Sequence, residues 1–231
     1  MPRHLRRTPG GMVFHVINRS VGRHTIFHKS EDYAAFERVL AEAHARIPIR
    51  ILAYTLMPNH WHFVLWPRTD EQVPEFVKWM SHTHTQRWHA HYHISGTGHL
   101  YQGRYKSFPI QSGLYLLVVL RYVERNALRA KMVARAEDWP WGSLFRRQQW
   151  RGLEILADWP IQRPSDWLEF VNEPQTPGEL EALRRSVNRC CPFGEEDWQQ
   201  EVMKELDLEA TMRPRGRLRK GVENGDEIND P

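Results

Sequence analysis

The sequence predicts an α+β protein in which helices pack on a mainly antiparallel β-sheet. Short β-rich runs alternate with longer segments of helical periodicity, in the order strand, helix, strand, strand, helix, strand. Only the turn-forming residues Met57, Pro58 and Asn59 separate the two middle strands, as in a hairpin. A hairpin makes the sheet antiparallel. The helices that precede and follow the hairpin in the sequence would cover a face of this sheet.

The first half of the chain supplies a strand, a helix and the hairpin. Residues 12–18 are β-rich and lie between two glycines and a polar segment, which is typical of a strand. From Ser30, apolar side chains recur at helical spacing until Pro48. Residues 49–56 predict the second strand, and the apolar run that begins at His60 is its hairpin partner.

The second half continues with a helix, a strand and a longer helix. A helix begins near residues 69–71 and extends towards the 80s or early 90s. Residues 103–110 predict a fourth strand on which Arg104 and Lys106 share a face. The next helix extends to about Ala130, with Leu and Val on one side and basic residues on the other. The order βαββαβ therefore predicts a ferredoxin-like sandwich with its helices on one face of the sheet.

Composition divides the chain into three parts. Residues 1–135 hold the α+β domain and a basic N-terminal arm. Residues 136–212 are rich in Trp and interrupted by Pro, and they predict a helical extension with helices near 165–172, 177–188 and 195–206. Residues 213–231 form a basic tail followed by an acidic end, and we expect the acidic end, residues 223–231, to be disordered.

The basic residues are unevenly spread. Thirty-two Lys and Arg against 28 Asp and Glu give a net charge of +4, but residues 1–11 and 213–220 contain several basic side chains and no acid. Such clusters bind phosphates, although a solvated basic terminus has the same composition. The adjacent Cys190 and Cys191 offer no disulfide framework, and the longest apolar run, residues 114–120, is too short to span a bilayer. The N-terminus lacks the apolar segment of a signal peptide, so we expect a soluble, cytoplasmic protein.

Two histidines, His60 and His62, open the third strand. Alternate strand residues face the same side, so the two imidazoles lie together while Trp61 and Phe63 point the other way. This geometry suits two ligands of one metal ion, but a pair of partly buried strand histidines would give the same pattern. The histidines between residues 82 and 99 lack Cys or carboxylate partners at ligand spacing, and we interpret them as a solvated or aromatic-packed helix end.

Tyr122 and Asn126 are four residues apart on the long helix and therefore share one face of it. Asn126 could offer its amide oxygen to a metal held by His60 and His62, with the Tyr122 phenol beside the ion. A tyrosine packed on the sheet and an asparagine near a helix end would account for the same pair.

The chain resembles the single-tyrosine HUH endonucleases, and among these the REP-associated tyrosine transposases of the IS200-like type, which act at repetitive extragenic palindromes. The resemblance spans nearly the whole chain and rests on segments in the same order, at residues 9–19, 57–62, 98–107, 115–130 and 213–220. Ala127 and Leu218 replace prolines that are common in the family, and simpler relatives carry Gln where Asn126 stands.

The resemblance implies that His60 and His62 bind a divalent metal, Mg²⁺ or Mn²⁺, with Asn126 as the third ligand and Tyr122 as the nucleophile. It implies metal-dependent cleavage and rejoining of single-stranded DNA at hairpin-forming sequences through a 5′-phosphotyrosine intermediate. The partner would be single-stranded DNA with a hairpin at the bacterial nucleoid, with no membrane, and a monomer or a homodimer would both fit. The expected DNA contacts are Arg7, Arg19, Arg104, Lys106, Arg121, Arg125, Arg213, Arg215, Arg217 and Arg219.

Two other functions fit parts of the pattern. A catalytically silent protein that binds structured nucleic acid would need only the basic ends, and it would have no physical need of the complete set of histidines, Tyr122 and Asn126. A zinc-dependent hydrolase would use His60, His62 and a bound water, but it lacks a carboxylate partner at motif spacing and leaves Tyr122 without a role.

Overall fold

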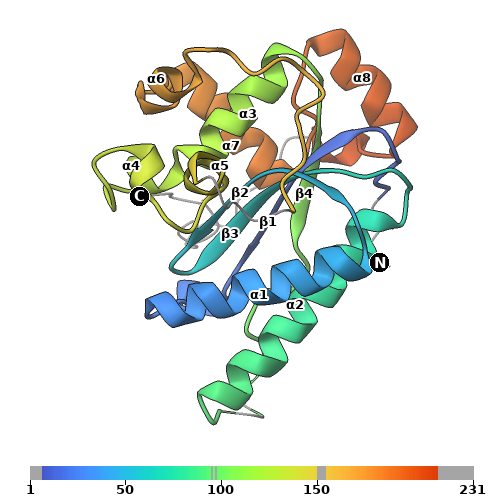
Figure 1. The fold of residues 1–231 in the computed structure, drawn as a ribbon. Coiled ribbons are helices and arrows are strands. Elements are labelled where there is room, and N and C mark those ends of the chain that lie inside the picture. The colour runs from blue at the N-terminus through green and yellow to red at the C-terminus, as the bar shows by residue number, and fades with distance from the viewer. Residues whose placement is uncertain (1–6, 95, 97, 150–154, 213–231) are drawn as a thin grey trace, which may run out of the picture.

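The computed structural model describes residues 7–94, 96, 98–149 and 155–212, and it contains a four-stranded antiparallel sheet (Figure 1). The strands lie in the order β2-β3-β1-β4. Their bounds are Val13–Arg19 for β1, Arg50–Met57 for β2, His60–Trp66 for β3 and Lys106–Ile110 for β4. This α+β fold, with its βαββαβ order, confirms the prediction from the sequence.

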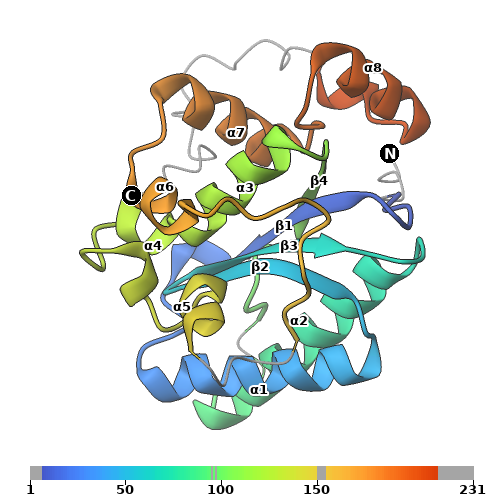
Figure 2. The same ribbon diagram turned by 45° about the horizontal axis from the view of Figure 1, so that its top comes forward.

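One face of the sheet is covered by two helices that lie side by side, α1 (Ser30–Arg46) and α2 (Gln72–His91) (Figures 1 and 2). Their apolar stripes include Phe36 and Phe76, which are fully buried with Trp61 and Phe63 of β3. Asp32 in the first turn of α1 accepts the backbone N–H groups of residues 28 and 29, which satisfies donors at the helix start.

The opposite face is covered by α3 (Leu114–Glu124), α4 (Asn126–Arg129) and the C-terminal helices (Figure 2). The single helix predicted through residue 130 is divided at Arg125, whose backbone nevertheless stays in the right-handed helical region. The amide of Arg125 bonds to the carbonyl of Arg121 at 2.8 Å, and that of Ala130 to Asn126 at 2.9 Å. The one-turn relation between Tyr122 and Asn126 therefore survives the division.

The C-terminal extension packs against the sheet rather than standing apart from it. Its helices are α5 (Ser143–Gln148), α6 (Trp167–Asn172), α7 (Pro177–Arg189) and α8 (Glu196–Glu205), three of them where the sequence predicts helices. Isolated bridges join it to both edge strands, to β2 through Gly142 and Leu156 and to β4 through Phe193. Trp167 and Leu183 of the extension share an apolar core with Val64 and Leu120, so the boundary at residue 135 remains a prediction.

The short 3-10 turns complete the fold, at Val21–Arg23, Ala136–Asp138 and Glu209–Thr211. None of the helices in the described part of the chain is long and apolar enough to cross a membrane. The predicted basic tail and acidic end at residues 213–231 lie outside the described residues.

Candidate active site

The strand β3 directs His60 and His62 towards α3, and it directs Trp61 and Phe63 into the core below α1 and α2. The two imidazole rings lie 5.0 Å apart between centroids, and the residues are 2 % and 0 % exposed. Across the sheet, Arg19 of β1 is the partner of His60. The alternation predicted from the sequence therefore holds, and the pair is buried beneath a helix.

Helix α3 brings Tyr122 onto this pair. The Tyr122 ring meets the His62 ring edge-on, with 5.8 Å between centroids. One turn further along, Asn126 is completely buried. The Thr55 hydroxyl of β2 donates to the carbonyl of Val123 at 2.6 Å, which ties this part of the helix to the sheet. Two segments some sixty residues apart in the sequence thus meet within one chain, a question that the sequence left open.

A second layer of side chains lies behind the two histidines. The Nδ1 atom of His62 is 2.8 Å from Nε2 of His15, a fully buried residue of β1. The Nδ1 atom of His60 is 2.6 Å from Oδ1 of Asn59. Sequence reasoning missed His15 as a site residue, because only the pairing of β1 with β3 brings it beside His62.

Arg129 is the second site residue that the sequence did not identify. Its guanidinium carbon lies 4.9 Å from the centroid of the Tyr122 ring, and its Nη2 donates to Oδ1 of Asn126 at 3.3 Å. Burial holds the pKa of His62 well below its usual value, and the neighbouring histidines and arginines, Arg129 among them, act in the same direction. His62 is therefore a neutral imidazole at pH 7.

The donor set fits a divalent metal ion. Nε2 of His62 is buried and has no hydrogen-bond partner among the described residues, as expected of an atom that awaits a ligand. The same part of the chain contains no group of three His, Cys, Asp or Glu placed to hold a metal. A third protein ligand at this site would have to be of another type. The amide oxygen of Asn126 is a suitable donor, because it keeps a second lone pair beside its bond to Arg129.

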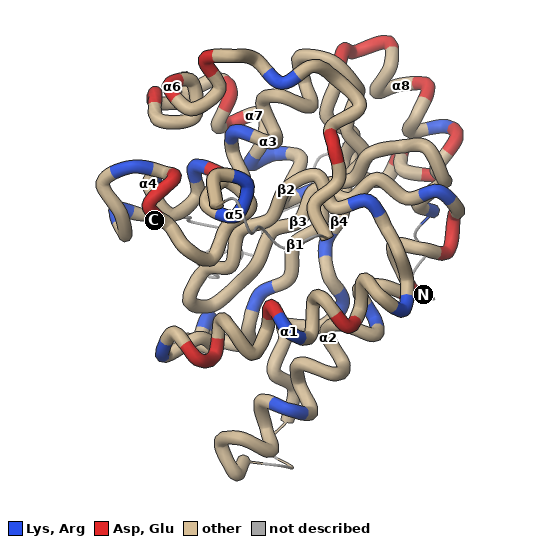
Figure 3. Tube along the Cα trace, in the orientation of Figure 1, with Lys and Arg blue, Asp and Glu red and all other residues tan. Residues whose placement is uncertain are grey.

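A cleft of about 180 Å³ leads from solvent to His60. Arg19 and Arg23 line it, together with Ala130 and Met132 from the segment that follows α4. Lysines and arginines also gather around α4 and α5 in Figure 3, whereas α8 carries four acids and a single Lys. An anionic chain that approaches this end of the sheet would meet positive charge first.

Three other predicted DNA contacts lie towards the β4 edge. Lys106 is half-buried and pairs across the sheet with Ile17, whose other cross-strand partner is His62. Arg104 is exposed and precedes β4, so the prediction that it belongs to that strand is corrected. Arg7 bonds to the carbonyl of Glu205 at 3.1 Å. Arg7 and Arg104 both line a pocket of about 880 Å³ between the N-terminal arm, α2 and α8.

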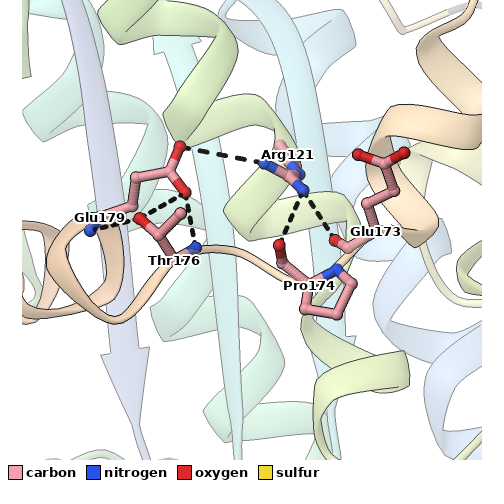
Figure 4. Close-up of polar contacts among 5 residues, drawn as sticks. All are labelled: Arg121, Glu173, Pro174, Thr176 and Glu179. Carbon is pink, nitrogen blue, oxygen red and sulfur yellow. Dashed lines mark hydrogen bonds and ion pairs between the residues drawn. The ribbon is translucent and has the colours of Figure 1, made fainter.

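The prediction for Arg121 is also corrected, because this residue is only 4 % exposed. Its Nη2 donates to the carbonyls of Glu173 and Pro174 at 2.8 and 3.2 Å (Figure 4). Its guanidinium lies 4.0 Å from the Phe170 ring. Arg121 therefore joins α3 to the extension and does not face a ligand. Arg125 is half-buried, and Arg213, Arg215, Arg217 and Arg219 lie outside the described residues.

Comparison with known proteins agrees with this arrangement. A family model described as transposase IS200-like matches residues 10–126, just over half of the chain. A solved REP-associated tyrosine transposase bound to a REP hairpin aligns with a TM-score of 0.50 and 18% identity, over 76% of this chain and 99% of its own. A candidate transposase from Deinococcus radiodurans aligns with a TM-score of 0.37 and 16% identity, over 57% of this chain and 90% of its own. A search of curated proteins found no significant match.

Proposed function

The chain belongs to the family of IS200-like transposases, and on this premise we propose that it cleaves and rejoins single-stranded DNA at hairpin-forming palindromic repeats. In this proposal Tyr122 is the nucleophile, and His60, His62 and Asn126 hold a divalent ion, Mg²⁺ or Mn²⁺. The chain would act on bacterial DNA at the nucleoid. The observation that carries the proposal is the edge-on contact between the Tyr122 and His62 rings, 5.8 Å apart, within one chain.

The chemistry is a transesterification. The Tyr122 oxygen would form a bond to the scissile phosphorus while the bond from phosphorus to the 3′ oxygen breaks. The phenol loses its proton and the leaving 3′ oxygen gains one, so one fragment ends in a 3′-hydroxyl and the other in a 5′-phosphotyrosine. Because one phosphate ester replaces another, a new 3′-hydroxyl can reverse the step without ATP.

The residues around Tyr122 favour this step in two ways. A free phenol has a pKa near 10 and is a weak nucleophile at neutral pH, so a positive charge close to it favours the reactive phenolate. Arg129, over the Tyr122 ring, supplies such a charge. A divalent ion bound by the two histidines and Asn126 would supply Lewis acidity to the phosphate.

The proposed DNA path follows the basic side chains at the site end of the sheet. Arg19 and Arg23 line the cleft at His60, and in this proposal they would contact the phosphates next to the cleaved bond. Arg7, Arg104 and Lys106 would contact DNA further away, together with the basic tail. A hairpin as partner is supported by the REP hairpin bound to the transposase of the same fold.

A covalent adduct tests the proposal. We expect the purified protein, mixed with a labelled palindromic single strand and Mn²⁺ or Mg²⁺, to form a protein–DNA band that survives denaturation. Tyr122→Phe should abolish the band. Tyr115→Phe is the matched control, since Tyr115 lies on the same helix but packs against Phe193. An undiminished band with Tyr122→Phe would show that the nucleophile is another residue.

The burial of Tyr122, which is 1 % exposed, favours a second candidate, a catalytically silent protein that binds structured nucleic acid. In that case the residues of the site would pack together without catalysing a reaction, and the basic surface would bind the nucleic acid. Salt-sensitive hairpin binding by both the wild type and His60→Ala, with no cleavage by either in any divalent metal, would support this candidate and exclude the first.

A further inference from the structure

The two hydrogen bonds behind the candidate ligands suggest how the histidines are prepared for a metal. We propose that Asn59 and His15 are positioning residues that fix the tautomers of His60 and His62, so that each imidazole keeps its Nε2 lone pair for the ion. The inference rests on the metal site of the proposed function but not on DNA cleavage. It assigns a task to two residues outside the His-x-His pair.

The orientation of Asn59 is determined by its second hydrogen bond. Its Nδ2 donates to the backbone carbonyl of Arg23 at 3.1 Å. A carbonyl only accepts, so the NH₂ group of the amide must point towards Arg23 and the oxygen towards His60. Because Oδ1 also only accepts, Nδ1 of His60, 2.6 Å away, carries the proton. The lone pair of the His60 ring then lies at Nε2.

Asn59 is itself held in place. It lies in the turn between β2 and β3, and its backbone carbonyl accepts the amide N–H of Ser20 at 2.9 Å. The loop that follows Ser20 carries Arg23, which lines the cleft at His60. Asn59 therefore connects the tautomer of His60 with the position of an arginine at the mouth of the site.

His15 performs the same task for His62. The two facing nitrogens, 2.8 Å apart and fully buried, share one hydrogen. Nε2 of His62, which has no hydrogen-bond partner among the described residues, can bind an ion only when it holds the lone pair of the ring. In the metal site proposed above, the hydrogen therefore lies on Nδ1 of His62 and is donated to Nε2 of His15. The pairing of β1 with both β3 and β4 fixes the backbone of His15 on two sides.

The first test is Mn²⁺ affinity, measured by isothermal titration calorimetry on the full chain without DNA. Loss of a hydrogen bond behind a metal-binding histidine typically weakens metal affinity about 10- to 100-fold. We expect a loss of this size for Asn59→Ala and for His15→Ala. His15→Gln and Asn59→Asp, which keep an acceptor oxygen, should recover most of it. The proposal would be overturned if both alanine variants bound Mn²⁺ with wild-type affinity. It would also be overturned if His60→Ala bound Mn²⁺ as tightly as the wild type does.

The matched control is Tyr101→Phe. It removes the buried hydrogen bond between the Tyr101 hydroxyl and Nδ1 of His84 at 2.7 Å, and also the one that this hydroxyl accepts from Nε1 of Trp61 at 3.0 Å. Trp61 and His84 both belong to the core under α1 and α2, on the face of the sheet opposite the candidate ligands. We expect Tyr101→Phe to leave Mn²⁺ affinity unchanged. An equal loss of affinity in this control would assign the effect to general destabilisation and contradict a positioning role.

The second test reads the tautomers directly. Nitrogen-15 NMR of the metal-free protein should show His60 and His62 protonated at Nδ1, and Asn59→Ala should change the signal of His60 alone. Protons at Nε2 in the wild type would contradict the inference, even if His15→Ala fails to fold. A wild type with the expected tautomers and Mn²⁺ affinity but no covalent DNA adduct would refute the proposed function and leave this inference standing.

Discussion

Replacement of Arg121 by Met separates a packing role from DNA binding. Arg121→Met keeps the aliphatic stem but removes two part-buried hydrogen bonds to the carbonyls of Glu173 and Pro174, each worth about 1.5–3 kcal/mol for a charged donor. The contact with the Phe170 ring adds about 1 kcal/mol, and the 3.9 Å ion pair with the partly exposed Glu179 adds less than about 1 kcal/mol. The variant also no longer bears the cost of taking the charged guanidinium out of water, and this offsets part of the sum. We expect a net loss of about 3–4 kcal/mol in the free energy of unfolding.

Urea denaturation and hairpin binding at several salt concentrations provide the assay. In a chain of this size a loss of about 3–4 kcal/mol corresponds to a Tm decrease of about 10 °C. At a temperature where the variant is folded, the salt dependence of hairpin binding should equal that of the wild type. Arg104→Met is the control: Arg104 is exposed, so stability should change by less than about 0.5 kcal/mol while DNA binding weakens. An Arg121→Met protein of wild-type stability with a reduced salt slope would refute the packing role.

Two further results are expected. Burial lowers the pKa of His84 to about 3, so protonation of this residue favours the unfolded chain. The free energy of unfolding should therefore fall as the pH drops from 6.5 towards 3, and the loss at pH 5 should be about 2 kcal/mol. Urea melts at pH 7 and pH 5 measure this, and His84→Gln should lose most of the pH dependence; an unchanged pH dependence would exclude His84 as its source. Tyr122 contacts His62 of its own chain, so we expect the site to work within one chain. An equimolar mixture of His60→Ala and Tyr122→Phe proteins should then form no more covalent adduct than the two variants alone. Strong recovery of adduct formation in the mixture would show a site shared between chains.

The order of elements could be predicted from the sequence because the signals are local. Alternation of apolar residues, the turn before His60 and the helical spacing after Ser30 depend only on near neighbours in the chain. The same alternation correctly placed His60 and His62 on one face of β3 and Trp61 on the other. The start of β4 was predicted three residues too early, because residues 103–105 continue the strand pattern without pairing with β1.

The rest of the site depends on contacts that no local pattern contains. His15 becomes a site residue only through the register of β1 against β3, and Arg129 only through the turn of α4 over Tyr122. Arg121 was predicted to face DNA because the basic side of the helix was taken as solvated. That side is covered by residues 170–179, about fifty positions later in the sequence. Tertiary packing thus decided which arginines remain available to a ligand.

The most direct test of the central claim is to identify the residue that carries the DNA. The adduct formed with Mn²⁺ and a palindromic single strand would be digested with nuclease and protease, and the peptide that keeps a nucleotide would be sequenced by mass spectrometry. We predict a nucleotide linked to Tyr122, and no linked peptide from the His60→Ala protein. A nucleotide on Tyr115 or another residue, or cleaved DNA without any linked peptide, would contradict the account.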